Sequence, residues 1–296
     1  MQHVFRSCLL TLMLSFSASL CSAQATMTWA MQDFAPVSVP IDGKPGFGII
    51  DETLKAVVRE MPGMEHRYLV ASAARIYAML DAGEPICFVG GLRTPEREQR
   101  YWLSDVRLVR PVQLIAHKRV RDQLPLDEAG RVRLPELLAL PGVRGVFVRK
   151  RSYGAALDSV LSQRPAGANV AMLGGASMGG NFFEMLRLDR ADYTIDYDFL
   201  VLHRQKLEGH KYEDLMILPI QGSEAPDVVV AVCPRTPWGR EAILRIDRIL
   251  AHLASIAGLG LPDSRWISPA GERMYGPAMR AFNQARRHLT PGLGAP

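Results

Sequence analysis

Apolar positions in the first third of the chain alternate between runs typical of strands and spacings typical of helices. Residues 49–61 carry apolar side chains at helical spacing, and Pro62-Gly63 ends that pattern. The resulting order of strand, helix, strand, helix and strand predicts an α/β fold with a mostly parallel sheet. The expected strands cover 28–34, 66–70 and 86–89, and the expected helices cover 49–61 and 73–82.

The same alternation restarts in the middle of the chain. Strand-like and helix-like patterns follow one another from residue 112 to residue 198, and a further strand and a long helix come after them. Two successive α/β units with a late return predict two lobes, and no fixed-period repeat is visible. The expected strands cover 112–116, 143–148, 169–173, 193–198 and 228–233, and the expected helices cover 134–140, 153–161, 181–188, 240–256 and part of 266–288.

The first 25 residues have the pattern of a cleavable signal peptide. Arg6 supplies a positive start, residues 8–16 are mostly apolar, and Ala23-Gln24-Ala25 matches a cleavage site. The apolar stretch is shorter than the roughly 20 residues that cross a bilayer. We therefore expect export to the periplasm. A buried N-terminal helix is the alternative, and a lipid anchor at Cys21 is disfavoured because Leu20 precedes it.

Charge and motif content exclude some classes of function. The net charge is +5, and it becomes +4 without residues 1–25, which contain Arg6 and no acid. This mild positive charge suits a small anionic ligand. The basic residues are scattered apart from Arg149-Lys150-Arg151, so nucleic-acid binding is not indicated. No His and Cys cluster has zinc spacing, and the glycine-rich turn 174–180 lacks a phosphate-loop ending, so neither a metal nor a cofactor is expected.

Two cysteines, Cys87 and Cys233, remain once residues 1–25 are set aside. An oxidising compartment favours a disulfide between the members of such a pair. Two buried free thiols are the alternative, because cysteine often packs as a small apolar residue.

The segment with the most chemical content runs from Gly90 to Arg97. It leaves the carboxyl end of an expected strand, where open α/β sheets bind ligands. Thr94 is a candidate helix N-cap, Pro95 suits the first helical position, and Arg97 lies one turn into the helix. The planar guanidinium of Arg97 fits a carboxylate. A surface arginine on a capped helix is the alternative.

Short motifs follow one another in a fixed order along nearly all of the chain after residue 25: Asp33-Phe34-Ala35-Pro36, Gly46-Phe47-Gly48-Ile49-Ile50-Asp51, Thr94-Pro95-Glu96-Arg97 with Leu103-Ser104, Pro135-Glu136-Leu137, Arg151-Ser152-Tyr153-Gly154, Arg190-Ala191-Asp192-Tyr193 and Cys233-Pro234-Arg235-Thr236. Their order and spacing resemble the bacterial extracellular solute-binding proteins of the polar amino-acid type. The resemblance implies the α/β, two-lobed type 2 periplasmic-binding-protein fold, with a central cleft and two hinge crossings. Lobe one would comprise residues 26–113 and 223–296, and lobe two residues 114–222.

The resemblance also implies a ligand site in the cleft. Thr94 and Arg97 would hold a ligand carboxylate from lobe one, and Phe34 would form an aromatic wall. Ser152 and Tyr153 would present hydroxyl and backbone N–H groups at the start of a helix, which attracts anions. On the residues alone, Ser152 is equally a simple helix cap, and Tyr153 and Phe34 are equally packing residues.

The late strand of lobe two leaves the nature of the ligand open. The amino-acid binders of this family place an acid there for the ligand ammonium, and here Asp196 and Asp198 flank Tyr197. A shift of one residue would turn either acid to the other face of the strand. Asp196 is the ligand-binding candidate. Arg93 adds a cation beside the expected site, with exposure to solvent as its alternative.

The resemblance further implies a monomer that captures a small anionic, carboxylate-bearing ligand for an ABC-type membrane permease. It also implies a disulfide between Cys87 and Cys233, because this fold makes their strands neighbours. Two alternatives remain. One is an enzyme on the same scaffold that acts on a small carboxylate, with Glu96, Asp51 and Glu184 as acid–base candidates. The other is a ligand sensor that signals through a partner protein.

Overall fold

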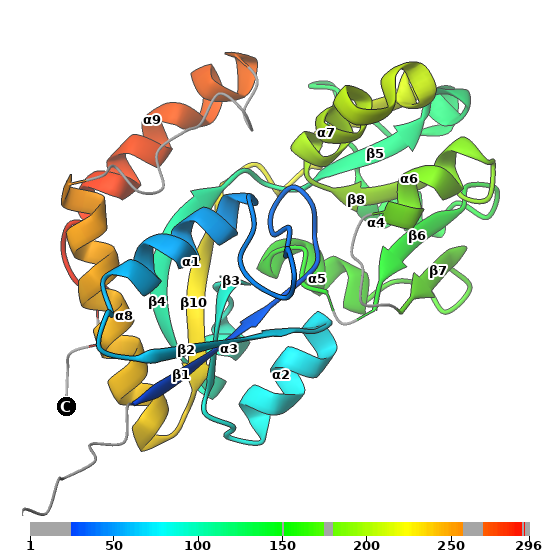
Figure 1. Cartoon of the computed structure of the whole chain (residues 1–296). Helices are drawn as coiled ribbons and strands as arrows, with labels where there is room; N and C mark the ends of the chain where they lie inside the picture. The colour runs from blue at the N-terminus through cyan, green and yellow to red at the C-terminus, as the bar shows by residue number, and fades with distance from the viewer. Residues whose placement is uncertain (1–24, 150, 175–179, 257–268, 292, 294–296) are drawn as a thin grey trace, which may run out of the picture.

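The computed structural model describes residues 25–149, 151–174, 180–256, 269–291 and 293, in two parts that each contain a five-stranded sheet (Figure 1). The expected signal peptide lies outside the described residues, as does most of the glycine-rich turn. No helix in the described ranges has the length and apolar character needed to span a membrane.

The first sheet has the strand order β2-β1-β3-β10-β4 and forms lobe one. Its strands β1, β2 and β3 are parallel, and β10 is antiparallel to both β3 and β4. Helices α1 and α8 cover one face, and α2 covers the other. The elements are β1 (Thr26–Met31), α1 (Ile49–Arg59), β2 (Glu65–Val70), α2 (Ala73–Asp81), β3 (Ile86–Leu92), α3 (Pro95–Arg100), β4 (Tyr101–Val109), β10 (Asp227–Pro234), α8 (Pro237–Ile256) and α9 (Pro269–Ala285).

The second sheet has the order β7-β6-β8-β5-β9 and forms lobe two. Strands β6, β7 and β8 run parallel, whereas β5 is antiparallel to its neighbours β8 and β9. The elements are β5 (Gln113–His117), η1 (Lys118–Gln123), α4 (Leu134–Ala139), β6 (Gly145–Val148), α5 (Ala155–Ser162), β7 (Val170–Leu173), α6 (Gly180–Arg187), β8 (Tyr193–Asp196), α7 (Asp198–Glu208), η2 (Gly209–Tyr212) and β9 (Leu215–Leu218).

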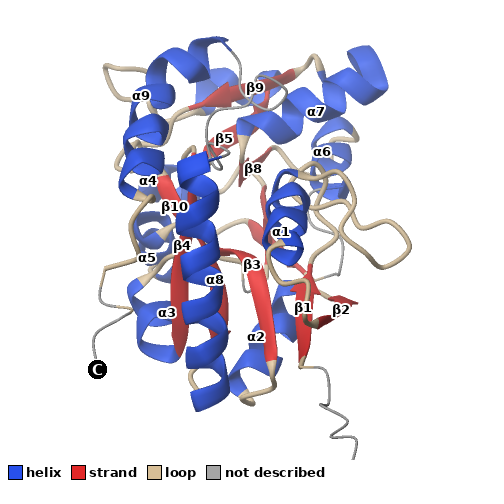
Figure 2. Ribbon diagram, turned by 60° about the vertical axis from the view of Figure 1, so that its left-hand side comes forward, coloured by secondary structure: helices blue, strands red, loops and turns tan. Residues whose placement is uncertain are grey.

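The chain crosses between the lobes twice, over 110–112 and again over 219–226 (Figure 2). This architecture confirms the expected two-lobed α/β fold, while the boundaries placed after residues 113 and 222 stay a prediction. Cys87 of β3 and Cys233 of β10 form a disulfide with their Cα atoms 4.5 Å apart. The expected bridge is therefore present, and it lies inside lobe one.

Strand β4 is the main element that the apolar pattern did not predict. Its Ser104 is fully buried, and the hydroxyl donates to Asp247 of α8 at 2.7 Å. Arg286 pairs with the same carboxylate at 2.7 Å. A polar network in the core thus holds a strand whose sequence has a polar residue at a buried position. Helix α7 was also not predicted, because charged residues interrupt its apolar spacing. Strand β9, a run of four apolar residues, was not predicted either.

Candidate functional site

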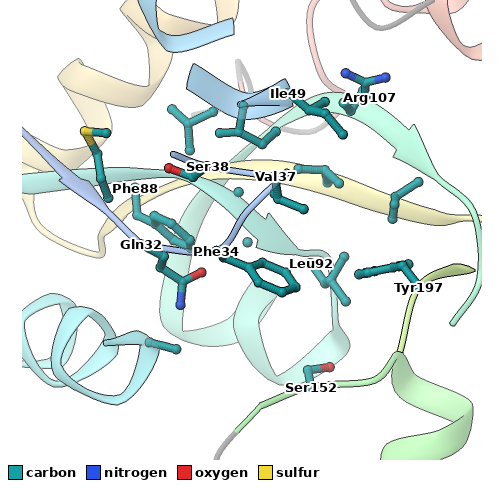
Figure 3. Close-up of a pocket in the computed structure, with 18 of the residues that line it drawn as sticks. Gln32, Phe34, Val37, Ser38, Ile49, Phe88, Leu92, Arg107, Ser152 and Tyr197 are labelled. Atoms are coloured by element: carbon teal, nitrogen blue, oxygen red, sulfur yellow. The ribbon is translucent and has the colours of Figure 1, made fainter. Parts of the chain in front are cut away.

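A cavity opens between the two lobes, and we call it the interlobe cavity. It holds about 1250 Å³ of space outside the atoms, adjoining solvent included. Lobe one contributes the loop after β1, helices α1 and α2 and strand β3, and lobe two contributes the segment after β6 and the start of α7. The wall is mainly apolar, as the close-up shows (Figure 3). Its apolar residues include Phe34, Val37, Ile49, Phe88, Leu92, Tyr197 and Phe199.

The loop that carries Phe34 is fixed by one buried carboxylate. Asp51, in the first turn of α1, accepts hydrogen bonds from the Ser38 hydroxyl at 2.7 Å, from Val39 N at 2.6 Å and from Gly48 N at 2.9 Å. These three hydrogen bonds tie the first turn of α1 to the loop. Asp51 therefore stabilises the loop that positions Phe34.

Arg97 reaches the interlobe cavity from the short helix α3. Thr94 caps this helix, because its hydroxyl accepts from Arg97 N at 3.2 Å. The Arg97 guanidinium donates to the Leu92 carbonyl at 2.8 Å and stacks on Tyr77, 4.5 Å from the ring centre. Over the described residues, no carboxylate pairs with Arg97. Its charge is held in place by a carbonyl and an aromatic ring, and it remains available to an anion.

Arg93, the second cation of this segment, is engaged elsewhere. It pairs with Asp105 at 2.5 Å and with Glu98 at 2.5 Å, and it does not line the interlobe cavity. Neither of the two alternatives offered for Arg93, ligand contact or free exposure, describes this arrangement. The acids of β4 and α3 neutralise its charge.

Ser152 of lobe two lies on the cavity wall, but its hydroxyl and the neighbouring backbone N–H already make hydrogen bonds within the protein. The Ser152 hydroxyl donates to Asp158 at 2.5 Å, and Tyr153 N donates to the same carboxylate at 2.7 Å. The Tyr153 ring is buried in the core, where its hydroxyl accepts from Val148 N at 2.9 Å, and burial raises the pKa of Tyr153 to about 12. Asp158 thus takes the donors that were expected to face an anion.

Arg151, on the cavity wall, and Asp196, behind it, form a buried bidentate ion pair. Its two hydrogen bonds are 2.8 and 2.5 Å long, and the side chains are 6% and 1% exposed. Burial alone would lower the pKa of the Arg151 guanidinium, but the Asp196 carboxylate outweighs it and raises that pKa. The guanidinium carbon also lies 5.2 Å from the Phe34 ring, 5.0 Å from Tyr153 and 5.8 Å from Tyr197.

Two arginines pair with the two acids that flank Tyr197, one arginine with each acid. Asp196 pairs with Arg151, and Asp198 pairs with Arg110 at 2.6 Å. Tyr197 between them lines the interlobe cavity. The sequence pointed to this strand end but gave no sign that both acids are already paired. Arg151 belongs to the one basic run that stands out in the sequence, and that run was the available signal.

The structure thus places three of the six expected ligand-binding residues, Phe34, Arg97 and Ser152, on the wall of the interlobe cavity. The other three lie behind that wall. Thr94 caps α3, Asp196 pairs with Arg151, and Tyr153 packs in the lobe-two core. Ligand binding by any of the six stays a prediction.

Of the three acid–base candidates, Asp51 lines the interlobe cavity, and Glu96 and Glu184 do not. Glu96 is exposed and pairs with Arg100 at 2.7 Å, and Glu184 pairs with Arg187. Within the described ranges, no group of three or more histidine, cysteine or acidic residues could hold a metal ion.

Comparisons with known proteins define the class of fold. No family model and no curated protein matches the chain. Among solved structures, an L-cystine ABC transporter from Listeria monocytogenes is similar at 18% identity and a TM-score of 0.63, covering 83% of this chain and 98% of that one. The substrate-binding protein of an amino-acid ABC transporter is similar at 17% identity and a TM-score of 0.57, and the match covers 78% of this chain and 94% of that one.

A third solved structure is a histidine kinase sensor domain with similarity to periplasmic binding proteins. It is 16% identical, with a TM-score of 0.60, and the match covers 80% of this chain and 92% of that domain. Identities this low show the fold alone. The chain has the type 2 periplasmic-binding-protein fold, and substrate-binding proteins of amino-acid ABC transporters are among the structures it resembles.

Proposed function

We propose that this protein is a periplasmic solute-binding protein that captures a small, carboxylate-bearing ligand between its lobes for an ABC-type permease. The observation that carries the proposal is Arg97, a cation on the wall of the interlobe cavity with no acid partner among the described residues. An anion that binds there completes a charge-assisted, bidentate contact. The fold supports the proposal, since structures that share it include ABC transporter substrate-binding proteins.

The six site residues divide into two kinds of role in this proposal. Arg97 binds the carboxylate, and Phe34 packs against the ligand body. Ser152 closes the cavity from lobe two. Thr94 acts by fixing the helix that carries Arg97. Tyr153 and Asp196 act by holding Arg151 beside Phe34, so six residues form one site without all touching the ligand.

Native mass spectrometry of the protein as purified tests the proposal. We expect a retained small molecule that carries a carboxylate and is released by unfolding, and the refolded monomer should take it up again from solution. Retention of a molecule without an acidic group would contradict the proposed ligand class. A mass spectrum that shows the protein without any bound molecule, together with no small molecule taken up from solution by the refolded protein, would contradict ligand capture itself.

A ligand sensor is the second candidate, because the same fold serves as a histidine kinase sensor domain in one similar structure. The genes beside this one distinguish the candidates. Permease genes favour import, and a kinase gene favours sensing. An enzyme is tested separately, by looking for turnover of the retained ligand during prolonged incubation.

A further inference from the structure

The charged residues that line the interlobe cavity are unbalanced in sign. Four are arginines, Arg97, Arg107, Arg110 and Arg151, and one is an acid, Asp51. Asp51 is 1% exposed and already accepts three hydrogen bonds from its own loop. The described part of the wall therefore contains no carboxylate that is free to pair with a ligand ammonium.

The acids immediately behind the wall are engaged as well. Asp196 is held by both terminal nitrogens of Arg151, and Asp198 is held by Arg110. An ammonium that entered the cavity would lose its hydration and would find no free carboxylate on the described wall, which instead carries the guanidinium of Arg97 without an acid partner. Burying an unpaired charge beside like charges is strongly unfavourable. The cavity thus discriminates against ligands with a positive group.

One neutral polar group on the wall is buried without a protein partner. The Tyr77 hydroxyl makes no hydrogen bond among the described residues. Buried polar groups in proteins are almost always partnered, so this hydroxyl requires an explanation. A ligand that accepts a hydrogen bond from it provides one.

Tyr77 stands next to the unpaired cation. The Arg97 guanidinium stacks on its ring, and Gly91, also on the wall, leaves space for the hydroxyl, because a Cβ there would lie 3.0 Å from that oxygen. Burial raises the pKa of Tyr77, so the hydroxyl keeps its proton and donates. A donor and a cation on neighbouring side chains suit the two oxygens of one carboxylate.

We propose that the ligand is an organic carboxylate with an apolar body and no ammonium group, whose carboxylate binds Arg97 and the Tyr77 hydroxyl. This rests on the proposed function and narrows it. The apolar body packs against Phe34, Phe88, Leu92 and Tyr197, which line the cavity (Figure 3). The protein then distinguishes simple carboxylates from the amino acids that have the same side chains.

Matched pairs of compounds test the proposal. 3-Phenylpropanoate and L-phenylalanine differ only in the ammonium group, as do 4-methylpentanoate and L-leucine. Calorimetry at pH 7.5 on protein that has been unfolded and refolded should show the carboxylate of a pair binding at least tenfold more tightly than its amino acid. Equal or tighter binding of the amino acid would overturn this inference and leave ligand capture standing.

Absence of binding by every member of a panel of such pairs would overturn it too. The mass spectrum of the purified protein then decides independently whether any ligand is captured.

Two tyrosine variants test the role of Tyr77. Tyr77→Phe removes only the hydroxyl. It should lower the affinity for the carboxylate that binds the parent most tightly by about 10- to 100-fold, the range for a hydrogen bond to a charged group. Its unfolding curve should stay close to that of the parent, because the hydroxyl has no partner in the protein. Tyr68→Phe, on β2 and away from the cavity, is the control and should leave affinity unchanged. Equal affinities for both variants and the parent would remove Tyr77 from the site.

Discussion

Arg151 of lobe two stacks on Phe34 of lobe one, with the guanidinium carbon 5.2 Å from the centre of the ring. The contact joins the segment after β6 to the loop after β1, and Phe34 is only 5% exposed and packs within the lobe-two core cluster. The lobes are therefore held together by an aromatic ring from one and a paired cation from the other.

Removing the Phe34 ring should open the protein. Phe34→Ala deletes an apolar contact between the lobes, and the two crossings join them sparsely enough to move. Small-angle scattering without ligand should give a larger radius of gyration for the variant than for the parent. Saturating ligand should reduce the radius of gyration of the parent, or leave it unchanged where the parent is already closed without ligand. Identical radii for the variant and the parent, with and without ligand, would argue against a hinge.

The ion pair of Arg151 and Asp196 should behave as a buried pair. Arg151→Met leaves the Asp196 carboxylate buried without its partner, which should lower the free energy of unfolding by about 3–5 kcal/mol. Adding Asp196→Asn removes the stranded charge and should recover much of that loss. The exposed pair of Arg67 and Glu65 is the control, and Arg67→Met should leave the free energy of unfolding almost unchanged. Urea unfolding of the double-mutant cycle measures all of these values, and additive effects would show that Arg151 and Asp196 do not interact.

Arg97 should dominate the affinity for a carboxylate ligand. Arg97→Ala removes the charged partner and should cost about 2–5 kcal/mol, a loss of roughly 30- to several-thousand-fold. Arg97→Lys should recover only part, because an ammonium lacks the planar fork. Arg93→Ala is the matched control and should have little effect, since Asp105 and Glu98 hold that side chain away from the cavity. Calorimetry decides, and near-parent affinity for Arg97→Ala would place the ligand elsewhere.

The disulfide should contribute strongly to the stability of lobe one. It joins residues 146 positions apart, and a loop of that length should stabilise the folded state by about 4–5 kcal/mol on the chain-entropy model. Replacing Cys87 and Cys233 together by alanine should lower the denaturation midpoint accordingly. The denaturation midpoint of the parent under reducing conditions, measured in the same way, is the comparison. Two free thiols counted in denatured, unreduced parent protein would contradict the bridge.

Asp227, at the start of β10, should make stability depend on pH. Burial raises the pKa of Asp227 to about 6, and the nearby Asp158 carboxylate adds to this effect. An unfolded aspartate titrates near 3.9, so between about pH 4 and pH 6 the unfolded state has lost a proton that the folded state keeps. The contribution of this group to stability therefore falls as pH rises through that window and is constant above it.

Asp227→Asn should remove this slope and make the protein more stable than the parent at pH 7. Urea unfolding from pH 4 to pH 7.5 measures the effect, with exposed Asp122→Asn as the control. A parent slope that Asp227→Asn does not change would assign the titration to another group.

The alternation of strands and helices, the two-unit organisation and the position of most elements could be predicted from the sequence. The periods of apolar side chains encode these features locally, as in the helix predicted over 49–61 and found as α1. The sequence also picked out Thr94 and Arg97, because a capped helix after a strand is a local signature. The resemblance to solute-binding proteins supplied the central cleft, the two hinge crossings and the disulfide pairing, which local patterns do not contain.

Which polar groups are free to meet a ligand depends on contacts between segments that are far apart in the sequence. Asp196, Asp198 and Ser152 look like ligand contacts in the sequence, but Arg151, Arg110 and Asp158 satisfy them in space. Strand β4 escaped prediction for a similar reason, since Asp247, 143 residues away, pairs with its buried Ser104. Hydrogen bonds and ion pairs between distant segments leave no periodic trace, so a polar residue that is satisfied within the protein and one that awaits a ligand have the same appearance in the sequence.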